Sequence, residues 1–262
     1  MELLGMFWQE HWIMAISILS FIAFLAGFVD SVAGGGGLFL VPGFLLVGLP
    51  PQVALGQEKV VSTLGTIAAI RNFLRESKIL WKVAIVGIPF SLLGAYLGAE
   101  AILLISPEIV GKVIVFLIPI GILLFLTPKD KEVKEHVLTN ITLYTTVPIL
   151  CTAIGFYDGF FGPGTGSMFI IAFHYLLKLN LVAASANSKM FNFASNIGAL
   201  VAFIIAKKVL YLLALPLIIS NIAGNHVGSH MALKKGSDMV RKVLIFSMFI
   251  LFLSCTIKYF LK

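Results

Sequence analysis

The chain alternates between long apolar runs and short polar interruptions, and the apolar runs have the length of helices. Most runs span about 20 residues, which is the length that an α-helix needs to cross the hydrocarbon core of a bilayer. The predicted segments are 12–29, 38–48, 52–74, 79–104 and 109–127, followed by 139–157, 166–178, 181–206, 210–232 and 239–260. The second and seventh segments hold roughly a dozen residues, so they reach about 18 Å of a core about 30 Å thick. We therefore expect an all-α integral membrane protein with about 8 to 10 membrane segments, two of them short broken or re-entrant helices.

Composition supports this interpretation. The chain of 262 residues is 59% hydrophobic and 12% charged, whereas soluble domains carry about 25% charged residues. A soluble globular protein is excluded by this deficit, and a membrane β-barrel is excluded because its strands are shorter and alternate. The net charge of +7 lies in a few loops, so the positive-inside rule explains it better than nucleic-acid binding. The acidic N-terminus lacks a basic region, and we expect no cleavable signal peptide.

Two halves of the chain share one pattern. Shifted by 128 positions, Gly27, Asp30 and Gly34 match Gly155, Asp158 and Gly162. After a gap of two residues the shift becomes 130, and Lys59 then matches Lys189. The glycine pairs Gly94–Gly98 and Gly224–Gly228 match as well; we expect them to permit close helix packing. The sequence thus predicts two membrane repeats, residues 1–130 and 131–262.

Basic residues predict the orientation of these repeats. They cluster near 71–82, in the linker at 129–134 and near 234–242, and we expect all three regions to be cytoplasmic. In this arrangement Lys207 and Lys208 lie on the outer side of the membrane, which the positive-inside rule does not favour. The halves have opposite orientation and both termini lie outside. Inverted repeats of this kind are common in secondary transporters.

Each half contains a glycine-rich interruption, "GFVDSVAGGGGLFLVP" and "GFYDGFFGPGTGSMFI". Glycine weakens a helix by about 1 kcal/mol, and a break inside a bilayer is tolerated only against protein or a water-filled cavity. The short helix that follows presents free N–H groups and a positive dipole end, which favour an anion. The candidate anion-binding residues of the two breaks are Gly34, Gly35, Gly36 and Gly37, and Gly162, Gly164, Thr165, Gly166 and Ser167.

Lys59 and Lys189 lie about 12 Å into their helices, near the bilayer midplane. An ammonium there costs at least ~2.5 kcal/mol on insertion scales, so something must compensate. Lys59 can pair with Asp30 or Glu58, and Lys189 with Asp158; alternatively, both lysines neutralise a bound anion. Both roles can hold together.

Neutral polar side chains accompany the lysines. Those selected as hydrogen-bond donors to the anion are Ser62, Asn192 and Asn196. Asp30, Glu58 and Asp158 are candidates for coupling to protons or another ion, because a carboxyl group inside the membrane is often part of a proton relay. His226 and His230 lie four residues apart but lack a third ligand, so we expect no metal site. With no P-loop lysine motif and no nucleophile–base pair, we expect neither a cofactor nor an enzyme.

The two glycine motifs, together with "NSKMFNFASNIGAL", resemble the TauE/SafE (sulfite exporter-like, TSUP) family over nearly the whole chain. In the first half Gln57 and Glu58 replace the Asn187 and Ser188 of the second, so the two half-sites are unequal. The resemblance implies a carrier, driven by an ion gradient, of sulfur-containing anions such as sulfite, sulfonates or sulfoacetate.

The sequence as a whole predicts an alternating-access exporter or importer of a small sulfur-containing anion in the cytoplasmic membrane of a prokaryote. Its expected partners are the anion and the lipid bilayer, with no nucleic acid, and a homo-oligomer is left open. Two alternatives remain: an anion channel, and a proton- or cation-linked transporter in which Asp30, Glu58 and Asp158 are the ligands.

Overall fold

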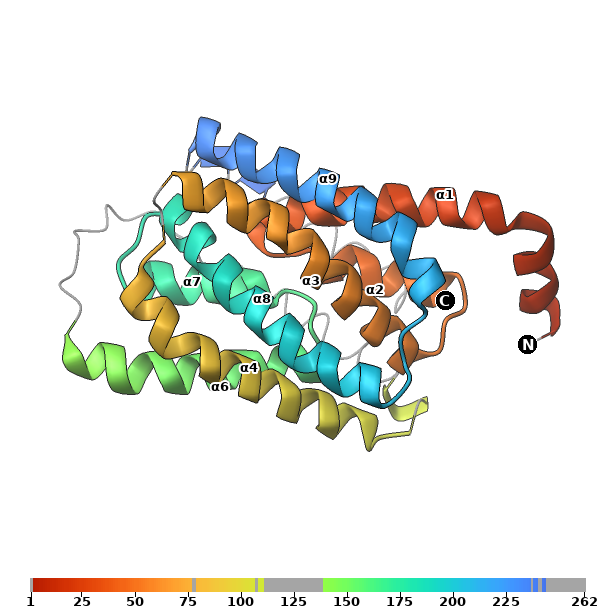
Figure 1. The fold of residues 1–262 in the computed structure, drawn as a ribbon, viewed down its shortest axis with the longest axis horizontal. Helices are drawn as coiled ribbons and strands as arrows, with labels where there is room; N and C mark the ends of the chain where they lie inside the picture. The colour runs from red at the N-terminus through yellow and green to blue at the C-terminus, as the bar shows by residue number, and fades with distance from the viewer. Residues whose placement is uncertain are drawn as a thin grey trace, which may run out of the picture.

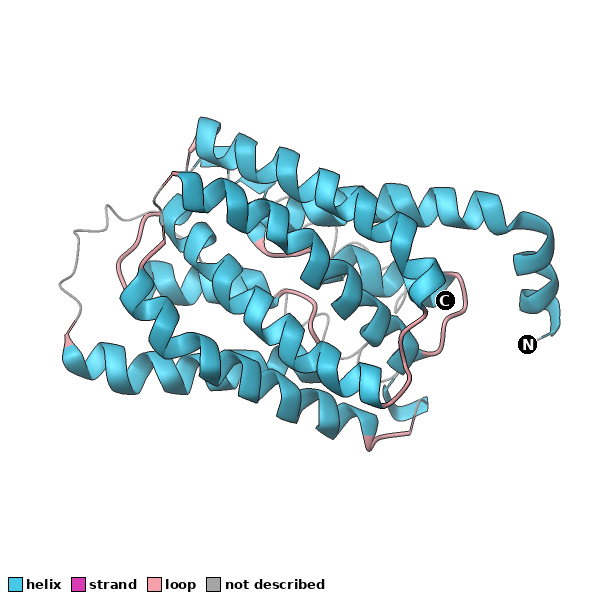
Figure 2. Ribbon diagram, viewed as in Figure 1, coloured by secondary structure: helices cyan, strands magenta, loops and turns pink. Residues whose placement is uncertain are grey.

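The computed structural model describes residues 2–76, 79–106, 108–110, 139–236, 238–239 and 242–243, with side chains from Trp12 onward. Within these residues the chain is helical and contains no strand (Figure 2). The first half contributes α1 (Glu2–Ala33), α2 (Gly37–Leu46), α3 (Pro51–Arg75) and α4 (Trp81–Leu103). The second contributes a π-helical turn (Thr142–Thr146), α6 (Val147–Phe160), α7 (Thr165–Leu176), α8 (Leu181–Ile205) and α9 (Tyr211–Lys235).

These helices correspond to eight of the ten expected segments. The two short helices, α2 and α7, have 10 and 12 residues, as the short apolar runs predict. Pro42 lies inside α2. The expected segments 109–127 and 239–260 fall almost wholly outside the described residues, as does the repeat boundary at 130.

The helices form a bundle in which each half packs against the other. α1 runs along α9, α4 runs along α6, and α3 and α8 lie between these pairs and contact one another (Figure 1). α3 and α8 run in opposite directions (Figure 1). The end of α3, the start of α4 and the end of α9 lie at one end of the bundle (Figure 1), so the basic residues Arg75, Lys82 and Lys234 gather there.

Apolar residues cover the outside of this bundle, whereas a small set of charged residues is buried within it. Leu212 and Ile219 of α9 are 86% and 70% exposed, whereas Lys59 and Lys189 are 1% and 0% exposed. Four helical stretches are long and apolar enough to cross a membrane: Trp12–Ala33, Trp81–Leu103, Leu181–Ile205 and Tyr211–Lys235. This arrangement is that of a multi-pass membrane protein, since apolar side chains face lipid and polar ones face protein.

Helical glycines allow the closest contacts, as the paired glycines predict. A Cβ atom at Gly98 of α4 would clash with the backbone carbonyl oxygen of Phe156 in α6, and one at Gly224 of α9 would clash with that of Phe24 in α1. Gly94 and Gly228 meet the same two partner helices. Their role in helix packing is confirmed.

The Gly98→Ala variant is expected to lower the melting temperature in detergent by several degrees, because α4 must move away from α6 to admit the methyl group. Gly43→Ala in α2 is the matched control. Its Cβ atom would meet flexible side chains, those of Ile22 at 3.3 Å and Leu19 at 3.8 Å, and no backbone, so we expect little change. Equal melting temperatures for the two variants would contradict the close contact between α4 and α6.

Candidate functional site

The two glycine breaks lie directly against each other in the centre of the bundle. α1 ends at Ala33 and α6 ends at Phe160, where the sequence predicts breaks. The amide N of Ser167 donates a hydrogen bond to the carbonyl O of Gly34 at 3.1 Å, and the Ser167 hydroxyl donates to the carbonyl of Ala33. The first turn of α7 is therefore held by the backbone of the break that ends α1.

Glycine is required in these breaks for two reasons. Gly34, Gly162 and Gly164 have φ angles of +75°, +90° and +89°, a region that side chains with a Cβ atom rarely adopt. A Cβ atom on Gly34 would also overlap the backbone of Gly166. The two breaks cross so closely that only hydrogen atoms fit between them.

The other predicted residues of the breaks lie beside this crossing. Gly36 precedes α2, Gly37 and Thr165 begin α2 and α7, and Gly35 lies between Gly34 and Gly36. The Thr165 hydroxyl donates to the carbonyl of Gly162 at 2.7 Å. Both breaks are thus compact, and their backbone groups lie next to the charged side chains described below.

Lys59 is the centre of the first charged cluster. Its Nζ lies 2.8 Å from Oδ1 of Asp158, 3.1 Å from Oε2 of Glu58 and 3.1 Å from Oδ1 of Asn196. Ser62 donates to Oε1 of Glu58 at 2.8 Å. Lys59 donates hydrogen bonds to Asp158 and Asn196, whereas Oε2 of Glu58 lies at ion-pair distance without a hydrogen bond.

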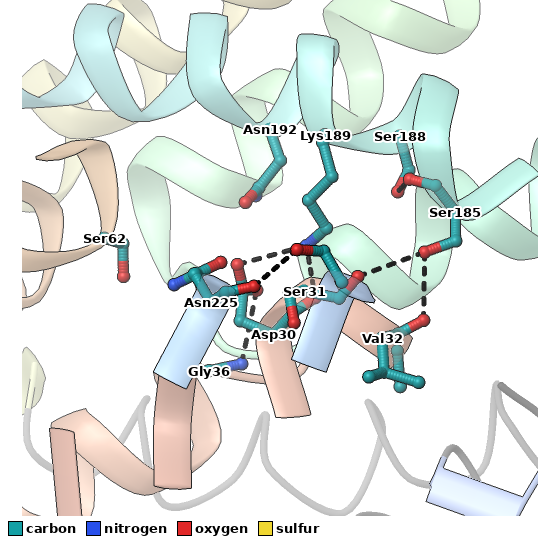
Figure 3. Close-up of polar contacts among 12 residues, drawn as sticks. Asp30, Ser31, Val32, Gly36, Ser62, Ser185, Ser188, Lys189, Asn192 and Asn225 are labelled. Atoms are coloured by element: carbon teal, nitrogen blue, oxygen red, sulfur yellow. Dashed lines mark hydrogen bonds and ion pairs between the residues drawn. The ribbon is translucent and has the colours of Figure 1, made fainter. Parts of the chain in front are cut away.

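Lys189 is the centre of the second charged cluster. Figure 3 shows its side chain extending from α8 to Asp30 at the end of α1. Its Nζ lies 3.0 Å from Oδ2 of Asp30 and also donates to the Asp30 carbonyl. The amide of Gly36 lies 3.4 Å from Oδ1 of the same aspartate, so this carboxylate links the lysine to the start of α2.

Each lysine pairs with the aspartate of the other half. The expected pair of Lys59 and Glu58 is confirmed, but the expected pairing of Lys189 with Asp158 is wrong, and so is that of Lys59 with Asp30. The reason is the packing of the two halves against each other, which places Asp158 of α6 beside α3 and Asp30 of α1 beside α8. Both ion pairs therefore join the two halves of the chain.

The neutral polar residues fall into two groups. Asn196 contacts Lys59, and its Nδ2 lies 3.4 Å from Oδ1 of Asn192, so these predicted residues do lie by the lysines. Ser188 instead donates to a carbonyl of its own helix. Ordinary helix hydrogen bonding explains it.

Gln57 and Asn187 have a role that the sequence did not reveal. Oε1 of Gln57 accepts the amide of Leu210, which precedes α9, at 3.1 Å, and Oδ1 of Asn187 accepts the amide of Leu80, which precedes α4, at 2.8 Å. Each side chain thus satisfies a backbone donor at a helix start in the other half. Both therefore anchor the chain where α9 and α4 begin.

Two further buried polar side chains were not among the predicted site residues, although Thr66 belongs to the polar stretch that contains Lys59. Asn225 of α9 lies beside Asp30 and Lys189 in Figure 3, and its Oδ1 is buried without a hydrogen-bond partner, as is Oγ1 of Thr66 in α3. Thr66 matches Asn196 at the shift of 130, since 66 plus 130 is 196. The alignment of the two halves could therefore have identified Thr66 as a candidate site residue.

Two grooves of the structure lie away from these clusters. One, of about 580 Å³, is lined by apolar side chains of α4 and α6, including Phe90, Ile149 and Phe156. The other, of about 290 Å³, is lined by Trp12, Leu49 and Leu213 among others. Their apolar linings fit lipid chains better than a small anion.

Comparison with known proteins identifies the lineage of the chain. Residues 19–255 match the family model described as "Sulfite exporter TauE/SafE". The chain belongs to the TauE/SafE family. This match covers both glycine breaks, both lysines and the three carboxylates that are buried among the described residues, so the whole site lies within the region common to TauE/SafE proteins.

Individual relatives of the chain are named as probable membrane transporters. A "probable membrane transporter protein ORF9" of Sinorhizobium sp is 34% identical over 236 residues, covering 88% of this chain and 90% of the relative. A "probable membrane transporter protein" of Haemophilus influenzae is 34% identical over 243 residues, covering 90% and 92%. The "probable membrane transporter protein YfcA" of Escherichia coli K12 is 32% identical over 232 residues, covering 88% and 85%. No solved structure matches the chain. Family and relatives make this TauE/SafE protein a membrane transporter rather than an enzyme.

Proposed function

We propose that the protein is a secondary transporter of a small sulfur-containing anion, built from two inverted repeats that move against each other. The observation that carries the proposal is the pair of crossed ion pairs, Lys59 with Asp158 and Lys189 with Asp30. Each joins the two halves at a helix break. An ammonium that leaves its aspartate can neutralise an anion at the same place.

Several observations support the inverted arrangement. α3 and α8 run in opposite directions (Figure 1), and each lysine is the ninth residue of its helix, since 59 follows 51 and 189 follows 181 by eight positions. α1 corresponds to α6 and α4 to α9 in the two halves. Because α1 packs on α9 and α6 packs on α4, the contacts are those that a two-fold axis between the halves would produce. Inverted repeats with broken helices and a central site are typical of alternating-access carriers.

The substrate class follows from the chemistry of the site and from the family description. Two buried ammonium groups with neighbouring Ser62, Asn192 and Asn196 offer charge and hydrogen bonds suited to an oxyanion. The matching family is described as a sulfite exporter.

We assign the protein to the cytoplasmic membrane of a prokaryote, with both termini outside. The grouping of Arg75, Lys82 and Lys234 at one end of the bundle favours a cytoplasmic location for that end.

A cation-linked transporter is the second candidate, because three carboxylates face only two ammonium groups in the described clusters. In that case Asp30, Glu58 and Asp158 would bind the transported ion, with the lysines as their counter-ions.

The test is the melting temperature of the purified protein with sulfite, thiosulfate, sulfate, sulfoacetate, taurine or chloride. A ligand that binds only the folded state stabilises it by about 2.7 kcal/mol at a hundred times its Kd. We expect one sulfur oxyanion to raise the melting temperature while chloride and zwitterionic taurine do not. Stabilisation by sodium with no effect of any anion would contradict the anion proposal and support the cation one.

A further inference from the structure

The two charged clusters differ by one carboxyl group. Glu58 lies next to Lys59, whereas the matching position beside Lys189 is Ser188, since 58 plus 130 is 188. The Ser188 hydroxyl donates to the Ser185 carbonyl at 2.7 Å and brings no charge. The asymmetry leaves three carboxyl groups against two ammonium groups in the described clusters.

Glu58 is buried, and one of its oxygens lacks a well-aligned donor. Its side chain is 5% exposed, and Oε2 lies 3.1 Å from Lys59 Nζ without forming a hydrogen bond of good geometry. Oδ2 of Asp158, which is 1% exposed, also lacks a donor. Burying an ionised carboxylate whose oxygens are not fully paired costs free energy. Oε2 of Glu58 and Oδ2 of Asp158 share one lysine, so a proton bound to one of these oxygens would lower that cost.

The surroundings of Glu58 offer it one positive charge. Lys59 and Ser62 contact it from its own helix, and Asp158 faces the same lysine from α6. Gly37 and Gly162, from the two breaks, close the remaining sides, since a Cβ atom on either would lie 3.4 Å from a Glu58 oxygen. The other charged pair nearby, Lys189 with Asp30, is already balanced. Within the described residues, Lys59 is thus shared between two carboxylates.

We propose that Glu58 binds a proton that is transported together with the anion. This inference rests on the anion-transport function proposed above and names its coupling ion. With every group ionised, the two lysines and three carboxylates sum to −1, because 2 − 3 = −1, and an incoming anion adds further negative charge. A proton that moves from water to Oε2 of Glu58 removes the excess and releases Lys59 from one of its two carboxylates, so that this ammonium can contact the anion. The same proton leaves Glu58 for water on the opposite side, when the anion leaves.

The test uses the full chain in liposomes that contain a pH-sensitive dye. The probes are radiolabelled thiosulfate, sulfate and sulfoacetate, whose charge does not change near neutral pH. The variants are Glu58→Gln, which resembles the protonated side chain, and Glu58→Ser, which copies the second half. The control is Glu76→Gln, the same change at an exposed position. The melting temperature of each variant establishes that it is folded.

For the wild type and the Glu76→Gln control, we expect anion uptake to acidify the liposome interior and an inward proton gradient to drive accumulation. Apparent affinity for the anion should rise by up to about tenfold for each unit of pH decrease, as linkage to one proton requires. In Glu58→Gln and Glu58→Ser, proton movement should fall at least about tenfold and the pH dependence should flatten. Exchange of labelled for unlabelled anion should continue.

The outcomes separate the two proposals. Proton movement that persists in folded Glu58→Gln and Glu58→Ser overturns the inference, and so does wild-type anion flux that moves no proton; the anion-transport function survives both. Absence of any flux of the three anions through the wild type overturns the proposed function, and the inference falls with it.

Discussion

Transport of the sulfur anion is expected to fall by about ten- to a hundredfold in the Lys189→Met variant. A hydrogen bond to a charged group contributes about 1.5–3 kcal/mol, and about 1.4 kcal/mol corresponds to tenfold in affinity. Methionine keeps the unbranched length of the side chain and removes the ammonium. The measurement is anion uptake into liposomes, together with the anion-dependent melting temperature.

The single variant also leaves Asp30 without its partner inside the bundle, and breaking a buried ion pair costs about 3–5 kcal/mol. A loss of transport could then reflect poor folding alone. The matched control is the double variant Lys189→Met with Asp30→Asn, which removes both charges and restores neutrality. We expect it to recover melting temperature but not anion binding. Anion transport at the wild-type rate in this double variant would show that Lys189 is a structural counter-ion.

The Gly34→Ala variant is expected to be the most destabilised single substitution in the site. The methyl group would overlap the backbone of Gly166, which cannot rotate away as a side chain would. In addition, the φ of +75° costs an alanine about 1–2 kcal/mol. We expect the melting temperature to fall by ten degrees or more (about 2–4 °C per kcal/mol for a chain of this size), or the folded protein to be lost.

Gly236→Ala separates the two causes. Gly236 also has a positive φ, +70°, with a ψ of −159°, a region that is adopted almost only by glycine, but a Cβ atom there would meet none of the described residues within 4 Å. Its loss of stability should therefore equal the backbone cost alone. If Gly34→Ala were no more destabilised than Gly236→Ala, the crossing of the two breaks would be much looser than the structure shows.

The sequence alone determined the helices and the location of the breaks. Apolar runs of helical length define α3, α4, α8 and α9 to within a few residues, because a helix in lipid satisfies its own backbone hydrogen bonds and needs no partner to do so. For α1 they predict the apolar part, 12–29, but not the first ten residues of the helix, which begins at Glu2. The glycine-rich motifs mark the ends of α1 and α6 for an equally local reason: clustered glycines and a positive φ do not continue a helix. The depth of Lys59 and Lys189 follows from counting residues along a helix.

Only the tertiary structure decided which of these residues meet. Spacing along one helix places Lys59 and Lys189 at a given height, but it says nothing about the helix that faces them. Packing of the two halves against each other places Asp158 beside Lys59 and Asp30 beside Lys189. It also exposes the charge imbalance around Glu58, which depends on distances between chain segments about a hundred residues apart. Interactions between distant segments arise from packing, and packing depends on all the side chains at once.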